Sequence, residues 1–537
     1  MNDLYPHPNG ATMKRHAVTL AVGTALVLSA CGANANSNDG DADGAGTATD
    51  TLTVAYSEGG TTLDPAIASD VTSDTFVLAA YDQLVTYART ETDGQFEADT
   101  SEIEPMLAES WDVSEDDTRY TFHLREGATF HDGSDLTAED VDATFDYIAS
   151  SSNASFLYGM AGIDDVQAID EYTVQIDLTA PNHLFLQILP MYSFSIINMD
   201  LVEENGGTDW LASNTAGSGP YTVDSWDPAS EAVLSRNDDY WGEAPALRQV
   251  TMKFIGEASN RVQLLQNGEV DVALEVPPKD VESLDAVDGV TIDSRASNKI
   301  LYFAMNNAIE PFDDPLVRQA ISYAIPYENL ISDVMMGQAS PMHSSVASST
   351  PGWTDAGYGY SHDLDRAREL LEEAGYPDGF EFDFTLGSGF QDWADDAVLI
   401  QAELAEIGVT MNIENMARPQ FLDALATGEV QSYISRWTSF VNDPGYHLGL
   451  LLTEDGTSNY VNYRNDEVND LWEQAATEPD ADIRADLYGQ MQEIISTEAP
   501  WAYLYEYNIV VAHRDGVEGY TSYPDGIIRF FQMSRTA

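Results

Sequence analysis

The sequence predicts an α/β protein made of two lobes that are built alike. Segments with alternating apolar and polar residues, typical of strands, are followed again and again by segments with helical spacing. Residues 261–275 and 421–437 repeat one pattern, in which an apolar helix leads through Gly-Glu-Val into a strand. Gly268 and Gly428 are expected to end the two helices. One unit of this kind in each lobe explains the repeat, and a chance match of short patterns is the alternative.

Three segments in the first part of the chain indicate strands. Residues 51–57 read TLTVAYS and residues 172–178 read YTVQIDL. Between them, Tyr120, Phe122 and Leu124 alternate with polar residues, which places all three on one face of a strand. This period of two predicts sheets with one face in a core.

Helix starts are marked by capping residues. Thr137 and Asp140 have the spacing of a capping box ahead of an apolar stripe. Asp314 precedes Pro315, and proline is favoured at the first helical position. Asp363 stands in the same way before the helical segment that follows it. We therefore expect a helix to begin directly after each of these caps.

The repeated units also indicate where a ligand would bind. In open α/β sheets, ligands bind beyond the carboxyl ends of the strands. This rule indicates Glu275 and Val276 in one lobe and residues 436–440 in the other.

The N-terminal segment predicts export and a lipid anchor. Residues 14–16 are basic and residues 17–30 carry no charge, a run too short to remain a membrane-spanning helix. Cys31 is the only cysteine, and the Leu-Ser-Ala-Cys sequence that it ends looks like a bacterial lipobox. We expect a signal peptide over residues 1–30, translation from Met13, and a diacylglycerol on the Cys31 thiol. A buried core cysteine is the alternative.

The composition is that of an acidic globular protein. Apolar residues make up 43% of the chain. It has 91 acidic and 22 basic residues, which gives a net charge of −69. A surface with so few cations cannot neutralise phosphates, which argues against nucleic acid as a partner. Such a surface fits a salty environment, and a lineage with generally acidic exported proteins is the alternative. Residues 31–50 are rich in Gly, Ala, Asn and Asp and predict a flexible tether.

Signatures of catalysis and of metal or cofactor binding are missing from the sequence. We find no GxxxxGK[ST] loop, no GxGxxG after a strand, no GxSxG elbow and no HExxH pair. Asp39, Asp41 and Asp43 resemble the start of a calcium loop, but no helices flank them and Asp50 stands where Glu is usual. The sequence therefore predicts no enzyme, no cofactor and no metal. A secreted hydrolase stays an alternative, because accidental carboxylate pairs are certain in so acidic a chain.

Seven segments resemble those of a known family. They are TLDPA (62–66), PMLAESWDVSEDDTRYTFHLREGATFHDGSDLTAEDV (105–141), GSGPYTVDSW (217–226), NGEVDVA (267–273), PFDDPLVRQAISYAI (311–325), DLDRARELLEEAGYPDG (363–379) and APWAYLY (499–505). In these segments the chain resembles the extracellular solute-binding proteins of peptide, nickel and oligosaccharide ABC importers.

The resemblance implies a two-lobed Venus flytrap of the periplasmic-binding-protein type with an inserted domain. Lobe I would contain residues 51–88, 213–300 and 500–537, the inserted domain residues 89–212, and lobe II residues 301–499. The hinge would lie at the two crossings, near residues 298–303 and 503–508. Such a protein, a monomer on the outer face of the membrane, closes on a solute and docks on a permease. A sensor that signals to a membrane receptor is the alternative.

One position departs from the family pattern. Peptide-binding members carry an Asp shortly after a Trp-Thr pair, and this Asp binds the α-ammonium of the peptide. In RWTSFVNDP that place is taken by Phe440, while Asp443 is expected to hold the loop. We therefore expect an oligosaccharide, or a blocked or atypical peptide, rather than an ordinary free-amine peptide. The predicted ligand-binding residues are Ser57, Glu58, Glu275, Trp437, Thr438, Ser439, Phe440 and Asn442.

Overall fold

The computed structural model describes residues 50–92 and 95–536. They belong to one compact unit, Thr47–Ala537. The predicted signal peptide, Cys31 and nearly all of the predicted tether lie outside the described residues.

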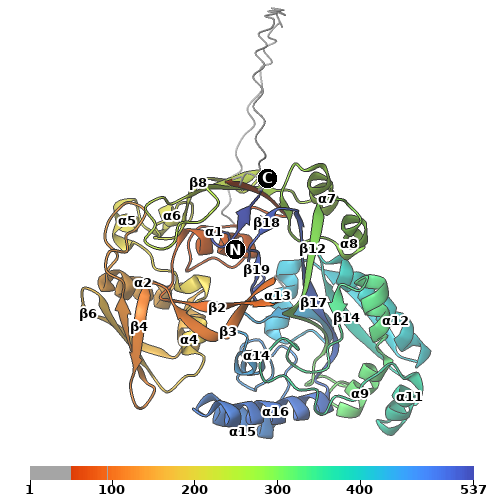
Figure 1. Cartoon of the computed structure of the whole chain (residues 1–537). Coiled ribbons are helices and arrows are strands. Elements are labelled where there is room, and N and C mark those ends of the chain that lie inside the picture. The colour runs from red at the N-terminus through yellow and green to blue at the C-terminus, as the bar shows by residue number, and fades with distance from the viewer. Residues whose placement is uncertain (1–49, 93–94, 537) are drawn as a thin grey trace, which may run out of the picture. The chain divides into compact units, whose positions relative to one another are not determined.

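The largest sheet has eleven strands, and β12 and β17 lie in its middle (Figure 1). Its strand order is β15-β14-β16-β12-β17-β11-β1-β10-β9-β8, and β13 pairs with β17 at the side. The strands are β1 (Thr51–Tyr56), β8 (Tyr221–Asp227), β9 (Glu231–Arg236), β10 (Gln249–Phe254), β11 (Val272–Ala273), β12 (Val290–Met305), β13 (Ala339–Ser340), β14 (Glu381–Gly387), β15 (Thr410–Met416), β16 (Ser432–Thr438) and β17 (Trp501–Arg514).

Two long antiparallel strands, β12 and β17, join the two halves of this sheet. One half continues through β11 and β1, and the other through β16 and β14. The ladder between β12 and β17 is irregular between Ala296 and Ile300 and again between Leu301 and Tyr302. These irregularities lie within or next to the predicted crossing at residues 298–303, so the regular sheet is interrupted where the chain passes between its two halves.

A separate four-stranded sheet lies within the predicted inserted domain. Its order is β4-β5-β7-β6, and α2 packs on it. As predicted, Tyr120, Phe122 and Leu124 are all buried in its core. The backbone N–H of Thr137 donates to the Asp140 carboxylate at 2.8 Å, as a capping box requires. The elements are β4 (Ala108–Val113), β5 (Arg119–Leu124), α2 (Ala138–Ser150), α3 (Ser155–Met160), β6 (Ile163–Asp170), β7 (Thr173–Leu178), α4 (Phe185–Ile188), α5 (Met199–Glu204) and α6 (Thr208–Leu211).

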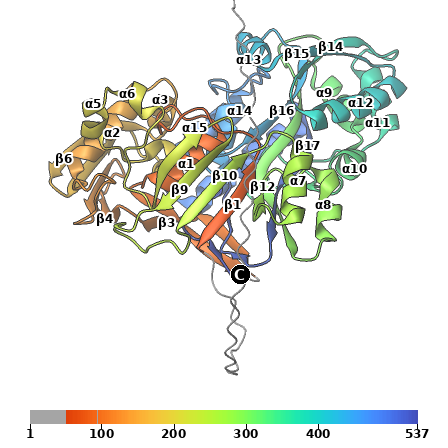
Figure 2. The same cartoon turned by 90° about the horizontal axis from the view of Figure 1, so that it is seen from above.

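Smaller elements complete the first half. A three-stranded sheet has the order β19-β3-β2, and β18 pairs with β20. Figure 2 shows α7 and α8 beside β12. The elements are α1 (Val71–Ala80), β2 (Val85–Thr92), β3 (Gln95–Pro105), α7 (Ala258–Asn267), α8 (Pro278–Asp285), β18 (Val517–Glu518), β19 (Thr521–Ser522) and β20 (Ser534–Arg535).

Two separate cores cover the two faces of the sheet in the second half. On β12, Leu301 and Phe303 enter one core, while Ile300 and Tyr302 enter the other. The helices α9, α11 and α12 contribute to the first core, and α13 to α16 to the second. Their bounds, with α10, are α9 (Pro315–Ala324), α10 (Tyr327–Asn329), α11 (Leu364–Glu373), α12 (Gln391–Glu406), α13 (Arg418–Thr427), α14 (Pro444–Leu451), α15 (Asp466–Ala476) and α16 (Ala481–Glu498). Two predicted caps are confirmed: the side chains of Asp314 and Asp363 accept backbone N–H groups of the first turns of α9 and α11.

Both repeated units fold as predicted. Gly268 ends α7 at φ 72° and Gly428 ends α13 at φ 70°, a left-handed conformation that favours glycine. The strands that follow are β11 and β16, which lie on opposite sides of the β12–β17 pair.

Candidate functional site

A cavity of about 410 Å³ lies where the two halves of the large sheet meet. We name it the hinge cavity, and residues from both halves line it, among them Tyr56, Glu275, Lys299, Asp392, Arg436 and Tyr507. The register explains its position. Val272 of β11 pairs with His513, which pairs with Thr291 near the start of β12, whereas Thr438 of β16 pairs with Lys299. The carboxyl ends of β11 and β16 therefore approach the middle of β12 from opposite directions, as the ligand-site rule for α/β sheets requires.

The first half contributes acidic groups. Glu58 follows β1 and Glu275 follows β11. The pKa of Tyr56 is raised mainly by burial, and the Glu275 and Glu58 carboxylates raise it further. Partial burial, followed by the nearby Asp70 and Glu275 carboxylates, raises the pKa of Glu58. This side of the cavity is therefore a region of negative potential.

A buried arginine fixes the backbone around Glu275. The Arg261 guanidinium, 4% exposed, donates to the carbonyls of Leu274 at 3.2 Å and Glu275 at 3.0 Å. It also donates to the carbonyl of Ile255 at 2.8 Å, at the end of the neighbouring strand β10. Glu275 itself has φ 53°, a left-handed conformation that is costly for a residue with a side chain. Arg261 therefore holds a strained turn that leaves the Glu275 side chain about half exposed beside the cavity.

The second half contributes cations. Leu301 of β12 is paired with Arg436 of β16, and Lys299 lies two residues before Leu301 on the same face. Burial, and then the positive charge of Arg436, lowers the pKa of Lys299 to about 8. The two cations therefore lie close enough to repel each other, and they come from the half of the sheet opposite to the one that carries Glu58 and Glu275.

Aromatic rings support these cations. The Phe390 ring contacts two guanidinium groups, with the Arg436 carbon 4.8 Å and the Arg418 carbon 5.1 Å from its centre. Such cation–π contacts orient a guanidinium without neutralising it. Nearby, the Tyr507 hydroxyl donates to Asp392 at 2.7 Å and accepts from the Trp393 indole at 3.1 Å. The polar wall next to the cations is therefore fixed by hydrogen bonds.

The predicted aromatic residues Trp437 and Phe440 do not line the hinge cavity. Trp437 follows Arg436 on β16, so it points to the opposite face, where it packs beside Tyr446. Its indole N–H donates to the Ser439 hydroxyl at 3.2 Å, and that hydroxyl also contacts His447 Nδ1 at 2.9 Å. Phe440 packs edge-on against Tyr192, with ring centres 6.3 Å apart.

The remaining predicted residues are scattered around this region. Ser57 follows β1 and is partly buried, and Thr438 pairs with Lys299. The Asn442 amide donates to the Ser349 carbonyl at 3.1 Å. Of the eight predicted residues, Glu275 alone lines the hinge cavity, with Glu58 near it. Sequence reasoning missed Lys299 and Asp392; the scarcity of lysine was the available signal for Lys299.

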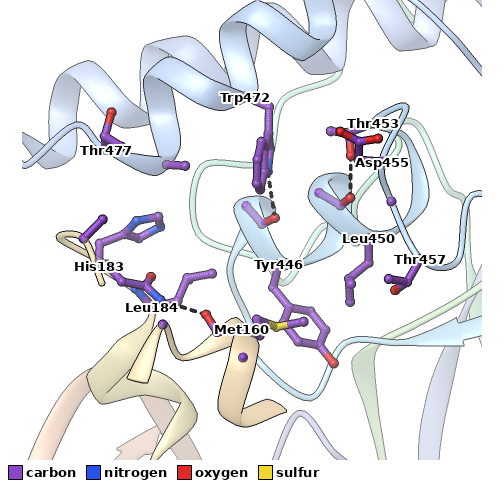
Figure 3. Close-up of a pocket in the computed structure, with 18 of the residues that line it drawn as sticks. Met160, His183, Leu184, Tyr446, Leu450, Thr453, Asp455, Thr457, Trp472 and Thr477 are labelled. Carbon is purple, nitrogen blue, oxygen red and sulfur yellow. Dashed lines mark hydrogen bonds between the residues drawn. The ribbon is translucent and has the colours of Figure 1, made fainter. Parts of the chain in front are cut away.

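A second cavity, of about 470 Å³, lies between the predicted inserted domain and α14 to α16 (Figure 3). Met160, His183 and Leu184 form one side of it, and Tyr446, Leu450 and Trp472 the other. His183 Nε2 is 3.5 Å from the Asp443 carboxylate and 3.4 Å from the Tyr488 hydroxyl. This largely apolar cavity offers few groups that could orient a polar solute, so the hinge cavity is the better candidate site.

Residues 50–92 and 95–536 contain no group of three or more His, Cys, Asp or Glu side chains placed to hold a metal ion. In the same part of the chain, no helix combines the length and apolar character that crossing a membrane requires.

Comparison with known proteins shows close relatives along nearly the whole described chain. Residues 102–459 match the family described as "Bacterial extracellular solute-binding proteins, family 5 Middle". The glutathione-binding protein of Shigella dysenteriae is 29% identical over 488 residues, covering 88% of this chain and 92% of that protein. Two solved structures are similar as well. The Helicobacter pylori periplasmic binding protein in complex with the peptide STSA has a TM-score of 0.78 at 30% identity, covering 91% of this chain and 98% of that one. The A. tumefaciens R10 protein in complex with agropinic acid has a TM-score of 0.76 at 26% identity, covering 91% and 99%.

Proposed function

The chain belongs to family 5 of the bacterial extracellular solute-binding proteins, and we propose that it captures a solute in the hinge cavity and delivers it to the permease of an ABC importer. The family is one of binding proteins, not of enzymes. The observation that carries the proposal is the position of the hinge cavity, between two half-sheets joined only by β12 and β17 in the large sheet. A solute that contacts both halves favours the closed form by its differential affinity for it.

The predicted domains accord with this role. Lobe I (51–88, 213–300 and 500–537) and lobe II (301–499) would close on the solute, with the inserted domain (89–212) beside them. The relatives include a glutathione-binding protein and a binding protein in complex with the peptide STSA. We propose a peptide-like solute as the first candidate, because the hinge cavity presents charges of both signs, and an oligosaccharide as the second.

The oligosaccharide alternative depends on the predicted aromatic residues. Trp437 and Phe440 would have to bind the solute with their faces, as aromatic rings bind sugars, while Thr438, Ser439 and Asn442 supply hydrogen bonds. Trp437→Ala should then weaken oligosaccharide binding by roughly 1 to 3 kcal/mol without unfolding the protein.

A thermal-shift screen tests the proposed function. Peptides, oligosaccharides and metal chelates are added to the purified protein, and a ligand at a hundred times its Kd should stabilise the fold by about 2.7 kcal/mol. Stoichiometric binding without turnover supports the proposal, and turnover supports the hydrolase. If a solute binds but is not transported, and a membrane receptor responds to the loaded protein, the ligand-sensor alternative holds.

We also propose that the mature protein is anchored by a lipid on Cys31. The basic residues, the apolar run and the Leu-Ser-Ala-Cys order support this assignment. Cys31→Ser should release the protein from membranes into the medium, whereas Ser29→Thr, which keeps the cysteine, should leave it attached. Membrane fractionation of both variants decides the matter, and a Cys31→Ser protein that stays with the membrane contradicts the anchor.

A further inference from the structure

Lys299 and Arg436 are two cations beside the hinge cavity without a protein counter-charge in contact. Among the described residues, neither side chain forms an ion pair or a hydrogen bond. Several other arginines pair with carboxylates: Arg295 is 2.6 Å from Asp293, and Arg529 is 2.7 Å from Asp525. Because the chain has 91 acidic residues, two neighbouring cations without a carboxylate partner are unexpected.

The surrounding structure keeps the two cations together at a cost. Both project from the same face of the β12–β16 ladder, so their Cα–Cβ bonds point to the same side of the sheet. Burial disfavours the charge on Lys299, and Arg436 disfavours it further. Phe390 contacts both Arg436 and Arg418, and neither of these neighbours supplies a negative charge to Arg436. Arg436 is exposed and contacts Phe390, so the cost of this arrangement falls mainly on Lys299.

The acidic groups of the cavity do not neutralise the cations. Glu275 and Asp392 act on Lys299 at a distance, and both raise its pKa less than burial lowers it. The Glu275 carboxylate, about half exposed, lies 3.8 Å from the Arg261 guanidinium, and Asp392 accepts a hydrogen bond from Tyr507. The cavity therefore has Glu275 on the side of the first half, and Lys299 and Arg436 together with Asp392 on the side of the second half.

We propose that Lys299 and Arg436 determine solute specificity by binding a carboxylate of the solute, while Glu275 faces its amino group. The captured solutes are then amino-acid-derived molecules with at least one free carboxylate. This inference rests on the proposed function, because it assigns the solute class of the same cavity. A carboxylate removes the repulsion between the two cations and gains charge-assisted hydrogen bonds from both.

Calorimetry with matched probes tests this proposal. The probes are the peptide STSA with its C-terminal amide, and glutathione with its diethyl ester. The free acids should bind, and the amide and the ester should have an affinity lower by at least about tenfold. Lys299→Gln and Arg436→Gln should each reduce binding of the free acids about tenfold or more, with little change for the amide and ester. Arg368→Gln, which alters an exposed arginine on α11, is the matched control.

Three outcomes overturn the proposal. The first is that each free acid and its amide or ester bind with equal affinity. The second is that the free acids bind to Lys299→Gln and to Arg436→Gln as tightly as to the wild type. In either case the proposed function stands, because a solute is still bound. Loss of binding with a lowered melting temperature in Arg436→Gln also counts against it, because removing the repulsion should leave the unliganded fold at least as stable.

A second measurement decides the matter even if none of these probes binds. The chain has four lysines, and Lys14 lies in the predicted signal peptide, so a mature protein gives three lysine signals after methylation with ¹³C-formaldehyde. Titration with acetate should shift the signal of Lys299 and leave those of Lys253 and Lys279 in place. The shift should be lost in Arg436→Gln. An unresponsive Lys299 overturns the carboxylate site, whereas failure of every solute to bind counts against the proposed function itself.

Discussion

The two helix–glycine–strand units have similar backbones, but they place side chains of opposite charge beside the hinge cavity. Each has a helix of ten residues, a left-handed glycine and a buried valine before its strand, Val270 and Val430. The first unit leads to Glu275, and the second carries Arg436. The comparison shows that the backbone motif sets where a side chain emerges, while the residue at that point sets the charge of each side of the cavity.

The units also differ in how their helices are held. Equivalent positions, 160 residues apart, are occupied by Arg261 in α7 and Phe421 in α13. Arg261 is hydrogen-bonded to carbonyls around Glu275, whereas Phe421 is fully buried and packs against Tyr433 with ring centres 5.9 Å apart. One unit is therefore held by polar contacts and the other by apolar packing.

The largest effect is expected from removing the apolar contact. Phe421→Ala leaves a cavity in the core of the second half and should lower the free energy of unfolding by about 3 to 5 kcal/mol. Leu422→Ala, at a neighbouring side chain that is 46% exposed, is the control and should change little. Urea unfolding measures both. A Phe421→Ala protein as stable as the control would show that α13 does not depend on packing.

Removing the polar contact should cost somewhat less. Arg261→Met leaves several backbone carbonyls of the first half without their donor and should lower the free energy of unfolding by about 2 to 4 kcal/mol. Arg366→Met, at an exposed residue paired with Glu369, is the control and should cost under about 0.5 kcal/mol. Equal losses in the two variants would contradict the role given to Arg261.

The strand that joins the two halves offers a test by pH. Glu506 of β17 is fully buried, accepts hydrogen bonds from the backbone N–H and the hydroxyl of Ser348, and has its pKa raised by burial to about 7. Its ordinary pKa is 4.5, so the folded state binds the proton more tightly, and stability falls as pH rises from 4.5 through 7.

Glu506→Gln keeps a neutral side chain at every pH and should remove this loss. The variant should match the wild type near pH 4 and exceed its free energy of unfolding by about 2 to 3 kcal/mol at pH 8. Urea unfolding across this range provides the measurement. A constant difference between the two proteins from pH 4 to pH 8 would show that Glu506 does not titrate there.

The smallest effect concerns the positive side of the cavity without ligand. Arg436→Gln removes a like charge, so the pKa of Lys299 should rise from about 8 toward its ordinary 10.5. In the wild type, the unfolded chain binds this proton between pH 8 and 10.5 and the folded protein does not, so stability rises with pH across that window. The variant should narrow the window and gain under about 1 kcal/mol at pH 7. Titration of the methylated Lys299 with pH measures its pKa. An unchanged titration midpoint in Arg436→Gln would show that Arg436 does not affect the charge of Lys299.

Local signals in the sequence predicted much of the fold. Gly268 and Gly428 end their helices, Asp314 and Asp363 cap theirs, and Thr137 and Asp140 form a capping box, because these features depend on a few neighbouring residues. The family could be recognised for a related reason, since its motifs are ordered runs of such local features. The approximate place of the site followed from the strand ends, which a general rule of α/β sheets places beside the ligand.

What only the tertiary structure decided is which side chains at those strand ends meet the cavity. Arg436 and Trp437 are neighbours in the sequence, yet successive side chains of a strand point to opposite faces, and the sequence does not say which face of β16 meets the other half. The pairing of β16 with β12 settled this, because it places Arg436 opposite Leu301 and beside Lys299, and sends Trp437 to the other core. The charge on each side of the hinge cavity thus comes from residues that are distant in the chain and meet only through strand register.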